Sequence, residues 1–314
     1  MASLIPEEIK KYCNSVIIGD VEGIWKDLLV DIENGKLKSY YKKDINYLTY
    51  PLPRYDLIMN KKLVGYLPVE IGRGCHNICS FCSIYCVYRG RYIKRGIDEV
   101  IRDIKYIRSL GFKKFCFVDS NICSDQEYLE KILIEVKDLK MSWFSQCSLQ
   151  IVHNDKLLKI MAESGCILLS IGLESISKKD LKDINKSWNN PDDYIDSINK
   201  ITDYGIEVVA TIMLGHNGDT EETIKKTAEF IINSKIIFPK ISSIIPTPGT
   251  DYYKKMLENN RIQKLDYYPS EKPVGYLIPK NMTFQKSIEL YWKLYDELYS
   301  IKNIIKRVFL GNKF

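Results

Sequence analysis

Three cysteines lie close together in the chain at a spacing that suits a soft metal centre. Cys75, Cys79 and Cys82 form a C-x3-C-x2-C pattern, and Cys86 follows four residues after the third. Thiolates on one short loop can converge on a single centre, for which zinc and an iron–sulfur cluster are the two candidates.

The position of Cys86 keeps both candidates open. Structural zinc needs four protein ligands, and Cys86 would supply the fourth. Zinc sites usually divide their ligands between two elements, whereas these four cysteines fall within 12 consecutive residues. A cluster held by three cysteines leaves one iron open to a substrate or cofactor. The pattern therefore favours an iron–sulfur cluster used in catalysis.

The elements that must position this loop follow a regular alternation. Short β-branched runs alternate with amphipathic stretches, the pattern of βα units that build a parallel sheet. We predict strands at residues 65–71, 115–119, 143–150, 167–173, 207–214 and 240–245. Helices are expected at residues 97–110, 126–139, 155–163, 191–204 and 221–233. Asp219 and Glu222 resemble a capping box at the start of the last of these helices. The fold class is α/β, a partial (βα)6 barrel of the TIM type.

Segments on both sides of this core set the expected domain organisation. Residues 1–50 precede the barrel, residues 51–64 form a proline-containing linker, residues 65–260 form the barrel, and residues 261–314 are a mostly helical extension. The segment 301–314 mixes Ile304, Ile305, Val308 and Phe309 with basic residues. Packing against the barrel explains that pattern, and a lipid-facing helix is the alternative.

Composition and charge limit the class of protein. The 314 residues carry a net charge of +6, with 46 Lys and Arg and 40 Asp and Glu spread along the chain, so no nucleic-acid partner is expected. No apolar run approaches the roughly 18 residues that cross a bilayer, and the N-terminus lacks a secretory pattern. We expect a cytoplasmic location. In a reducing cytosol the nine cysteines are better explained as ligands or buried apolar groups than as disulfides.

With aromatic Phe81 just before the third cysteine, the loop resembles the signature of the radical S-adenosylmethionine superfamily. The resemblance implies that Cys75, Cys79 and Cys82 bind three irons of a 4Fe-4S cluster, while the amino and carboxylate groups of S-adenosylmethionine chelate the fourth. It also implies that Phe81 packs near the adenine, and it leaves the catalytic residues open.

Later strand ends carry further matches to this superfamily. FVDSN resembles the turn near the methionine end of the cofactor, which points to Asn121, and SIGLES resembles the segment whose carboxylate lies near the cofactor, which points to Glu174. IMLGHNGDTEE and IIPTPGTDYY resemble the fifth and sixth strand ends, where backbone near Gly215 and Pro246 approaches the adenine. Asn121 and Glu174 could instead cap a turn and a helix. The remaining thiols of this region are expected to be buried or incidental: Cys86, Cys116, Cys123, Cys147 and Cys166.

The resemblance also implies an activity. A reduced cluster would cleave S-adenosylmethionine to a 5′-deoxyadenosyl radical that acts on an unactivated carbon, with a flavodoxin or ferredoxin as the one-electron donor. The protein would contribute positioning and exclusion of competing donors. The substrate class stays open between a small molecule, a lipid, a tetrapyrrole and a peptide.

The N-terminal stretch and the C-terminal helices are similar to the branch of the superfamily that carries a cobalamin-binding domain, whose members commonly transfer methyl groups. The stretch present here is too short for a complete doubly wound domain. No histidine precedes His76, so the Asp-x-His-x-x-Gly cobalt-ligand motif is absent. Either the chain has lost cobalamin chemistry, or it borrows the domain from a separate cobalamin-binding chain, or it is a fragment.

Three functions follow from these alternatives. Methyl transfer to carbon is the leading one, and a cobalamin-free radical oxidase or cyclase is the second. The third is a non-catalytic interaction module stabilised by an iron–sulfur cluster or zinc. The intact strand-end segments favour an enzyme, because a scaffold would not need them.

Overall fold

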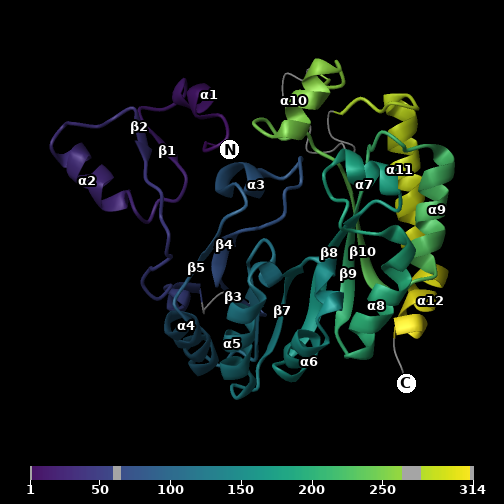
Figure 1. The fold of residues 1–314 in the computed structure, drawn as a ribbon, viewed down its shortest axis with the longest axis horizontal. Coiled ribbons are helices and arrows are strands. Elements are labelled where there is room, and N and C mark those ends of the chain that lie inside the picture. Colours follow the sequence, from purple (N-terminus) through teal and green to yellow (C-terminus); the bar gives the residue numbers. More distant parts are fainter. Residues whose placement is uncertain (1, 59–64, 264–276, 312–314) are drawn as a thin grey trace.

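The centre of the protein is a six-stranded parallel sheet. The computed structural model describes residues 2–58, 65–263 and 277–311. The strand order is β10-β9-β8-β7-β6-β3, so each strand of this sheet pairs with the one that precedes it in the chain (Figure 1). The strands are β3 (Leu67–Val69), β6 (Lys114–Phe117), β7 (Ser142–Cys147), β8 (Cys166–Glu174), β9 (Glu207–Leu214) and β10 (Ile236–Ser243). This order confirms the predicted α/β partial barrel.

The helices that connect these strands lie along one side of the sheet (Figure 1). They are α4 (Ile97–Ser109), α5 (Gln126–Lys137), α6 (Asp155–Glu163), α8 (Tyr194–Asp203) and α9 (Glu221–Ile232). Each turns an apolar stripe inward; in α4 the side chains of Val100, Ile104 and Ile107 are fully buried at helical spacing. All five begin or end within three residues of the predicted bounds.

The start of α9 differs from the prediction. Thr220, not Asp219, caps the helix, and it forms the capping box with Thr223 instead of Glu222. Asp219 turns back toward the end of β9, where its Oδ2 accepts hydrogen bonds from the backbone N–H of Gly215 and His216. Thr220 and Asp219 are neighbours with similar capping preference, so the sequence pattern could not separate them.

The segment between β3 and α4 contains elements that the periodicity did not predict. β4 (Gly72–Gly74) and β5 (Tyr92–Lys94) form an antiparallel pair, and α3 (Ser83–Tyr88) lies between them. Gly74 has a φ of 99°, and a Cβ at this position would collide with the carbonyl oxygen of Arg91. A glycine is therefore required directly before the first cysteine.

The N-terminal region forms a small unit of its own. It contains α1 (Pro6–Lys10), β1 (Val16–Ile18), α2 (Trp25–Glu33) and β2 (Tyr40–Lys42), and the two strands pair in parallel. Its core of Ile24, Leu28 and Tyr41 is separate from the main core. Arg73 links the unit to the rest of the protein through ion pairs of 3.0 Å to Asp20 and 2.7 Å to Glu22.

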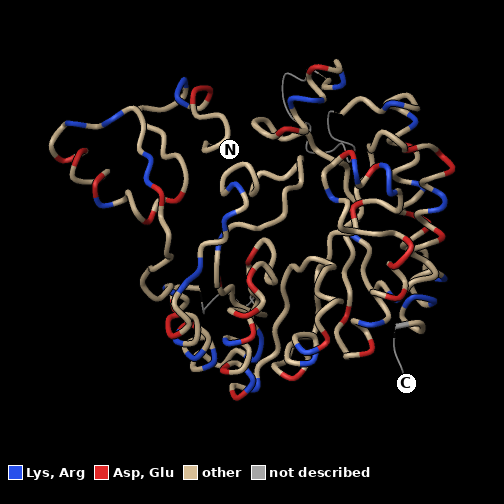
Figure 2. The backbone as a smooth tube through the Cα atoms, viewed as in Figure 1, with Lys and Arg blue, Asp and Glu red and all other residues tan. Residues whose placement is uncertain are grey.

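Two helices follow the barrel at the C-terminal end, α11 (Phe284–Leu298) and α12 (Ile301–Gly311). Packing against the barrel does not account for most apolar side chains of α12, since Ile301 is 77% and Phe309 64% exposed. Over residues 301–310 of this helix, Arg307 is the buried residue, and it donates to the carbonyl of Leu298. Within the described ranges, no helix combines the length and apolarity that crossing a membrane requires. Acidic and basic residues are interspersed over all parts of the fold (Figure 2).

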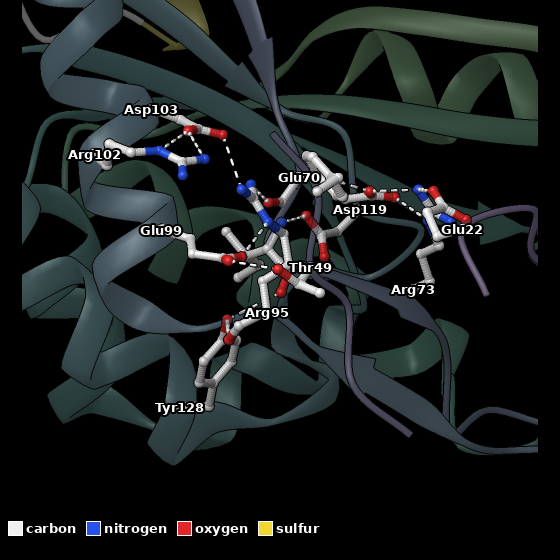
Figure 3. Close-up of polar contacts among 12 residues, drawn as sticks. Glu22, Thr49, Glu70, Arg73, Arg95, Glu99, Arg102, Asp103, Asp119 and Tyr128 are labelled. Carbon is white, nitrogen blue, oxygen red and sulfur yellow. Dashed lines mark hydrogen bonds and ion pairs between the residues drawn. The ribbon is translucent and has the colours of Figure 1, made fainter. Parts of the chain in front are cut away.

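A buried arginine joins the two ends of the segment between β3 and α4. Figure 3 shows the Arg95 guanidinium among its partners, donating to the carbonyl of Glu70 at 2.9 Å and to Asp103 of α4 at 3.0 Å. Its guanidinium carbon also lies 3.9 Å from the ring centroid of Tyr50. Removing one partner of such a buried ion pair is costly, because the other charge stays buried without compensation.

Replacing Arg95 by alanine should therefore lower the free energy of unfolding by about 3–5 kcal/mol, because Asp103 would keep its buried charge without its buried partner. Arg102 also pairs with Asp103, at 2.7 Å, but is 43% exposed, so Arg102→Ala should cost about 1 kcal/mol or less. Urea unfolding of both variants tests this, and equal losses would contradict the assignment.

Asp119 joins the same segment to the end of β6. Its carboxylate accepts hydrogen bonds from the backbone N–H of Ile71 at 3.1 Å and from the hydroxyl of Tyr92 at 2.9 Å. Burial nevertheless raises the pKa of Asp119 to about 7, because the two hydrogen bonds only partly offset the loss of solvation. The folded protein thus holds this proton more tightly than the unfolded chain does.

The raised pKa predicts a pH-dependent stability. The stabilisation that comes from the raised pKa of Asp119 is complete below the unfolded pKa of about 4, and it is lost as the pH rises through the folded pKa of about 7. Asp119→Asn cannot ionise at this position. Its free energy of unfolding should therefore rise by about 2–3 kcal/mol relative to that of wild type as the pH goes from 5 to 8. Urea unfolding across this range measures the gain, and a difference that stays constant with pH would contradict it.

Candidate active site

The three cysteines of the C-x3-C-x2-C loop line one cavity over the carboxyl ends of the strands. This cavity, of about 310 Å³, is also lined by residues at the carboxyl ends of β7 and β8 and just after β6. Among the predicted site residues, those that line it are Cys75, Cys79, Phe81, Cys82, Asn121 and Glu174. Carboxyl ends of parallel strands are where α/β barrels place their functional groups. The topology thus brings together residues that are 99 positions apart in sequence, from Cys75 to Glu174.

Backbone hydrogen bonds hold the loop in this position. The N–H of Ser80 donates to the carbonyl of Ile184 at 3.0 Å, and the carbonyl of Ser80 accepts from the N–H of Tyr252 at 3.0 Å. Tyr252 lies in α10 (Asp251–Glu258), and Ile184 follows α7 (Lys178–Asp183). A residue at the centre of the loop is therefore fixed to two late parts of the chain.

The thiols have the donor chemistry and the surroundings that a cluster needs. Cys79 is 8% exposed, and burial raises the pKa of its thiol to about 12. A buried thiolate needs a nearby positive charge, which a bound iron ion would supply. In the described part of the chain, no three His, Cys, Asp or Glu side chains lie close enough together to hold a single metal ion. Binding of a cluster by the three thiols stays a prediction.

Cys86 does not complete the set. It lies in α3, one turn beyond Cys82, and lines a different cavity, between this helix and the N-terminal unit. The zinc alternative with Cys86 as fourth ligand therefore lacks geometric support. His76, within the same loop, is exposed.

Asn121 connects the loop to two strand ends. Its Oδ1 accepts from the backbone N–H of Cys123 at 3.3 Å and from that of Ser148 at 2.9 Å. Its Nδ2 lies 3.8 Å from the Sγ of Cys75 and donates toward it. Asn121 is thus both the cap of η2 (Ile122–Ser124), as the alternative explanation held, and a neighbour of the first cysteine.

Glu174 enters the cavity paired with a lysine that the sequence analysis missed. Its Oε1 lies 2.7 Å from the Nζ of Lys186, and both side chains are buried. Glu174 has a φ of 66°, a left-handed conformation that is uncommon for a non-glycine residue. Lys186 lies on the loop after α7 rather than at a strand end, so neither periodicity nor motif identified it. The positive charge of Lys186 opposes the burial effect on the pKa of Cys79.

Gly215 and Pro246 lie outside the residues that line this cavity. Gly215 follows β9 and borders a separate small void beside Ile244 and Leu277, and Pro246 is buried just after β10. Thr211 and Met213 of β9 and Lys240 of β10 line the cavity in their place. The approach of Gly215 and Pro246 to an adenine therefore stays a prediction.

Comparisons with known proteins agree with this geometry. The Radical SAM superfamily model matches residues 69–231, which is more than half of the chain. Bacteriochlorophyllide d C-12(1)-methyltransferase of Chlorobaculum tepidum is 30% identical over 98% of this chain and 69% of its own length.

Solved structures share the fold. OxsB, solved with aqua-cobalamin and S-adenosylmethionine bound, matches with a TM-score of 0.72 at 15% identity, over 95% of this chain and 52% of that one. TsrM of Kitasatospora setae, solved with tryptophan and a SAM analogue, matches with a TM-score of 0.68 at 12% identity, over 96% of this chain and 65% of that one. The chain thus spans about half to two-thirds of these structures. On the extent of the family match and the identity to its relative, the chain belongs to the radical S-adenosylmethionine superfamily of enzymes.

Proposed function

We propose that this chain carries the catalytic barrel of a radical S-adenosylmethionine methyltransferase that acts on an unactivated carbon. The observation that carries the proposal is the single cavity in which three thiols face Asn121, Glu174 and Lys186. The name of the 30% identical relative supports methyl transfer as the reaction. When bound, a 4Fe-4S cluster with S-adenosylmethionine supplies one-electron cleavage of the cofactor.

The protein side chains have distinct roles in this proposal. Cys75, Cys79 and Cys82 hold three irons, and Asn121 fixes the orientation of Cys75. Lys186 presents a buried cation to the cofactor carboxylate, and Glu174 offers an acceptor to the cofactor hydroxyl or amino groups. Burial of this pair means that each keeps little competing contact with water.

Further components lie beyond the described barrel. The parallel β1–α2–β2 unit has the architecture expected at the end of an α/β domain. We propose that cobalamin binding requires the rest of such a domain, from additional sequence or a separate chain. Electrons come from a flavodoxin or ferredoxin. The relative's name makes a tetrapyrrole the first substrate to test.

Anaerobically reconstituted and reduced protein should convert S-adenosylmethionine to 5′-deoxyadenosine, measured by chromatography. Cys79→Ala should reduce this conversion at least about 100-fold, because one iron loses its ligand. Cys86→Ala is the matched control and should keep the activity, since Cys86 lines another cavity.

The outcomes of this assay separate the candidate functions. A methylated tetrapyrrole, formed when cobalamin and a chain that supplies the rest of the cobalamin-binding domain are added, would support the proposed reaction. Release of 5′-deoxyadenosine without methylation under these same conditions would favour the oxidase or cyclase. A cluster that forms without cleaving the cofactor would leave only the interaction module.

Lys186→Met should weaken binding of S-adenosylmethionine to the reconstituted protein by about 10- to 100-fold, the size of a lost hydrogen bond to a charged group. Lys182→Met is the control, because Lys182 is exposed on the preceding helix. Isothermal titration measures both. Equal affinities in the two variants would remove Lys186 from the cofactor site.

A further inference from the structure

Two buried cysteines outside the cluster loop face each other at the edge of the cavity. The Sγ atoms of Cys123, in η2, and Cys147, at the end of β7, are 3.2 Å apart. Both residues are at least nine-tenths buried, and Cys147 lines the cavity. A disulfide needs the sulfurs at about 2.05 Å. The two sulfurs therefore need to approach each other by little more than 1 Å.

The same two segments are already joined by Asn121. Its Oδ1 accepts from the N–H of Cys123 and from the N–H of Ser148, the residue that follows Cys147. Its Nδ2 donates toward Cys75 at 3.8 Å. A disulfide that draws the backbone of Cys123 and Cys147 together therefore shifts the two N–H groups from which Asn121 accepts, and with them its contact to Cys75.

We infer that Cys123 and Cys147 form a redox-active dithiol that closes to a disulfide and, through Asn121, changes the environment of Cys75. The oxidant is a small-molecule disulfide of the glutathione type. Cys147 attacks one of its sulfurs and releases one small thiol, and Cys123 then displaces the second. Two protein S–H bonds and one small-molecule S–S bond are replaced by one protein S–S bond and two small thiols, so atoms and electrons balance.

The cavity explains which thiol reacts first. Cys147 is reached through the space that Cys75 and Asn121 also line, whereas Cys123, within η2, is not among the described residues that line it. Burial raises the pKa of the Cys147 thiol, which slows its attack on a disulfide. The link to Cys75 rests on the proposed cluster, but formation of the disulfide itself does not.

The chain offers a matched control in the same proteolytic fragment. Trypsin releases residues 115–131, with Cys116 and Cys123, and residues 141–156, with Cys147 alone. Cys116 is half-buried, and its Sγ donates to the carbonyl of Phe117. A Cys116→Ser variant removes one of the two candidate sulfurs in the first fragment and leaves the pair intact.

The full chain, with its cluster reconstituted anaerobically, is incubated with oxidised glutathione, quenched with N-ethylmaleimide and mapped by mass spectrometry. Wild type and Cys116→Ser should yield the cross-linked pair of fragments, reversed by dithiothreitol. Cys123→Ser and Cys147→Ser should each yield none. Separate, alkylated fragments in wild type, or a cross-link that survives Cys123→Ser, would overturn the assignment. If the protein takes up no cluster, the proposed function fails, yet this readout still decides the disulfide.

Visible circular dichroism of the oxidised cluster tests the link to Cys75. The spectrum should change on glutathione treatment in wild type and Cys116→Ser, and it should stay constant in Cys147→Ser. A disulfide that forms without any spectral change would overturn the coupling through Asn121. Reversal of the change by dithiothreitol, with iron content constant, excludes cluster loss as its cause.

Discussion

The buried guanidinium of Arg95 is the contact on which the geometry of the site depends. The chain leaves the sheet after β3, runs through β4, the cysteine loop, α3 and β5, and returns at Arg95. Arg95 closes this excursion by donating its side chain to the carbonyl of Glu70 and its backbone N–H to that of Ile71. All three predicted ligands lie inside the closed segment. Their position over the strand ends is therefore set by a charge network outside the cavity.

Residues late in the chain also help to hold the cysteine loop in place. The bonds from Ser80 to Ile184 and Tyr252 fix the far side of the cysteine loop, and the Lys186–Glu174 pair brings opposite charges to the cavity wall. Asn121 adds a polar contact from the second strand end. The site thus combines a loop that is strongly tied at its base with a wall built from later strands. This division is typical of barrels in which function lies at the carboxyl edge.

Much of this architecture followed from local pattern. The spacing of Val100, Ile104 and Ile107 predicts α4 because burial of an apolar stripe requires that period. The cysteine loop and the strand-end residues Asn121 and Glu174 followed from a motif and from its place after a strand. Lys186 could not be predicted, because its role depends on a loop that reaches the cavity only in the folded chain. The buried face of α12 also escaped prediction, since apolar content alone does not say that Arg307 turns inward.

The anchoring of Ser80 has a consequence for the order of assembly. Cys75, Cys79 and Cys82 are synthesised early, whereas Ile184 lies 104 residues and Tyr252 172 residues beyond Ser80. Each strand pairs with the one made before it, so the sheet grows from a single edge as the chain emerges from the ribosome. The contact of Ser80 with Ile184 becomes available once α7 has been made, whereas the contact with Tyr252 of α10 must wait until β10 has been added. The cysteine loop therefore gains its last backbone anchor only after the whole sheet is complete.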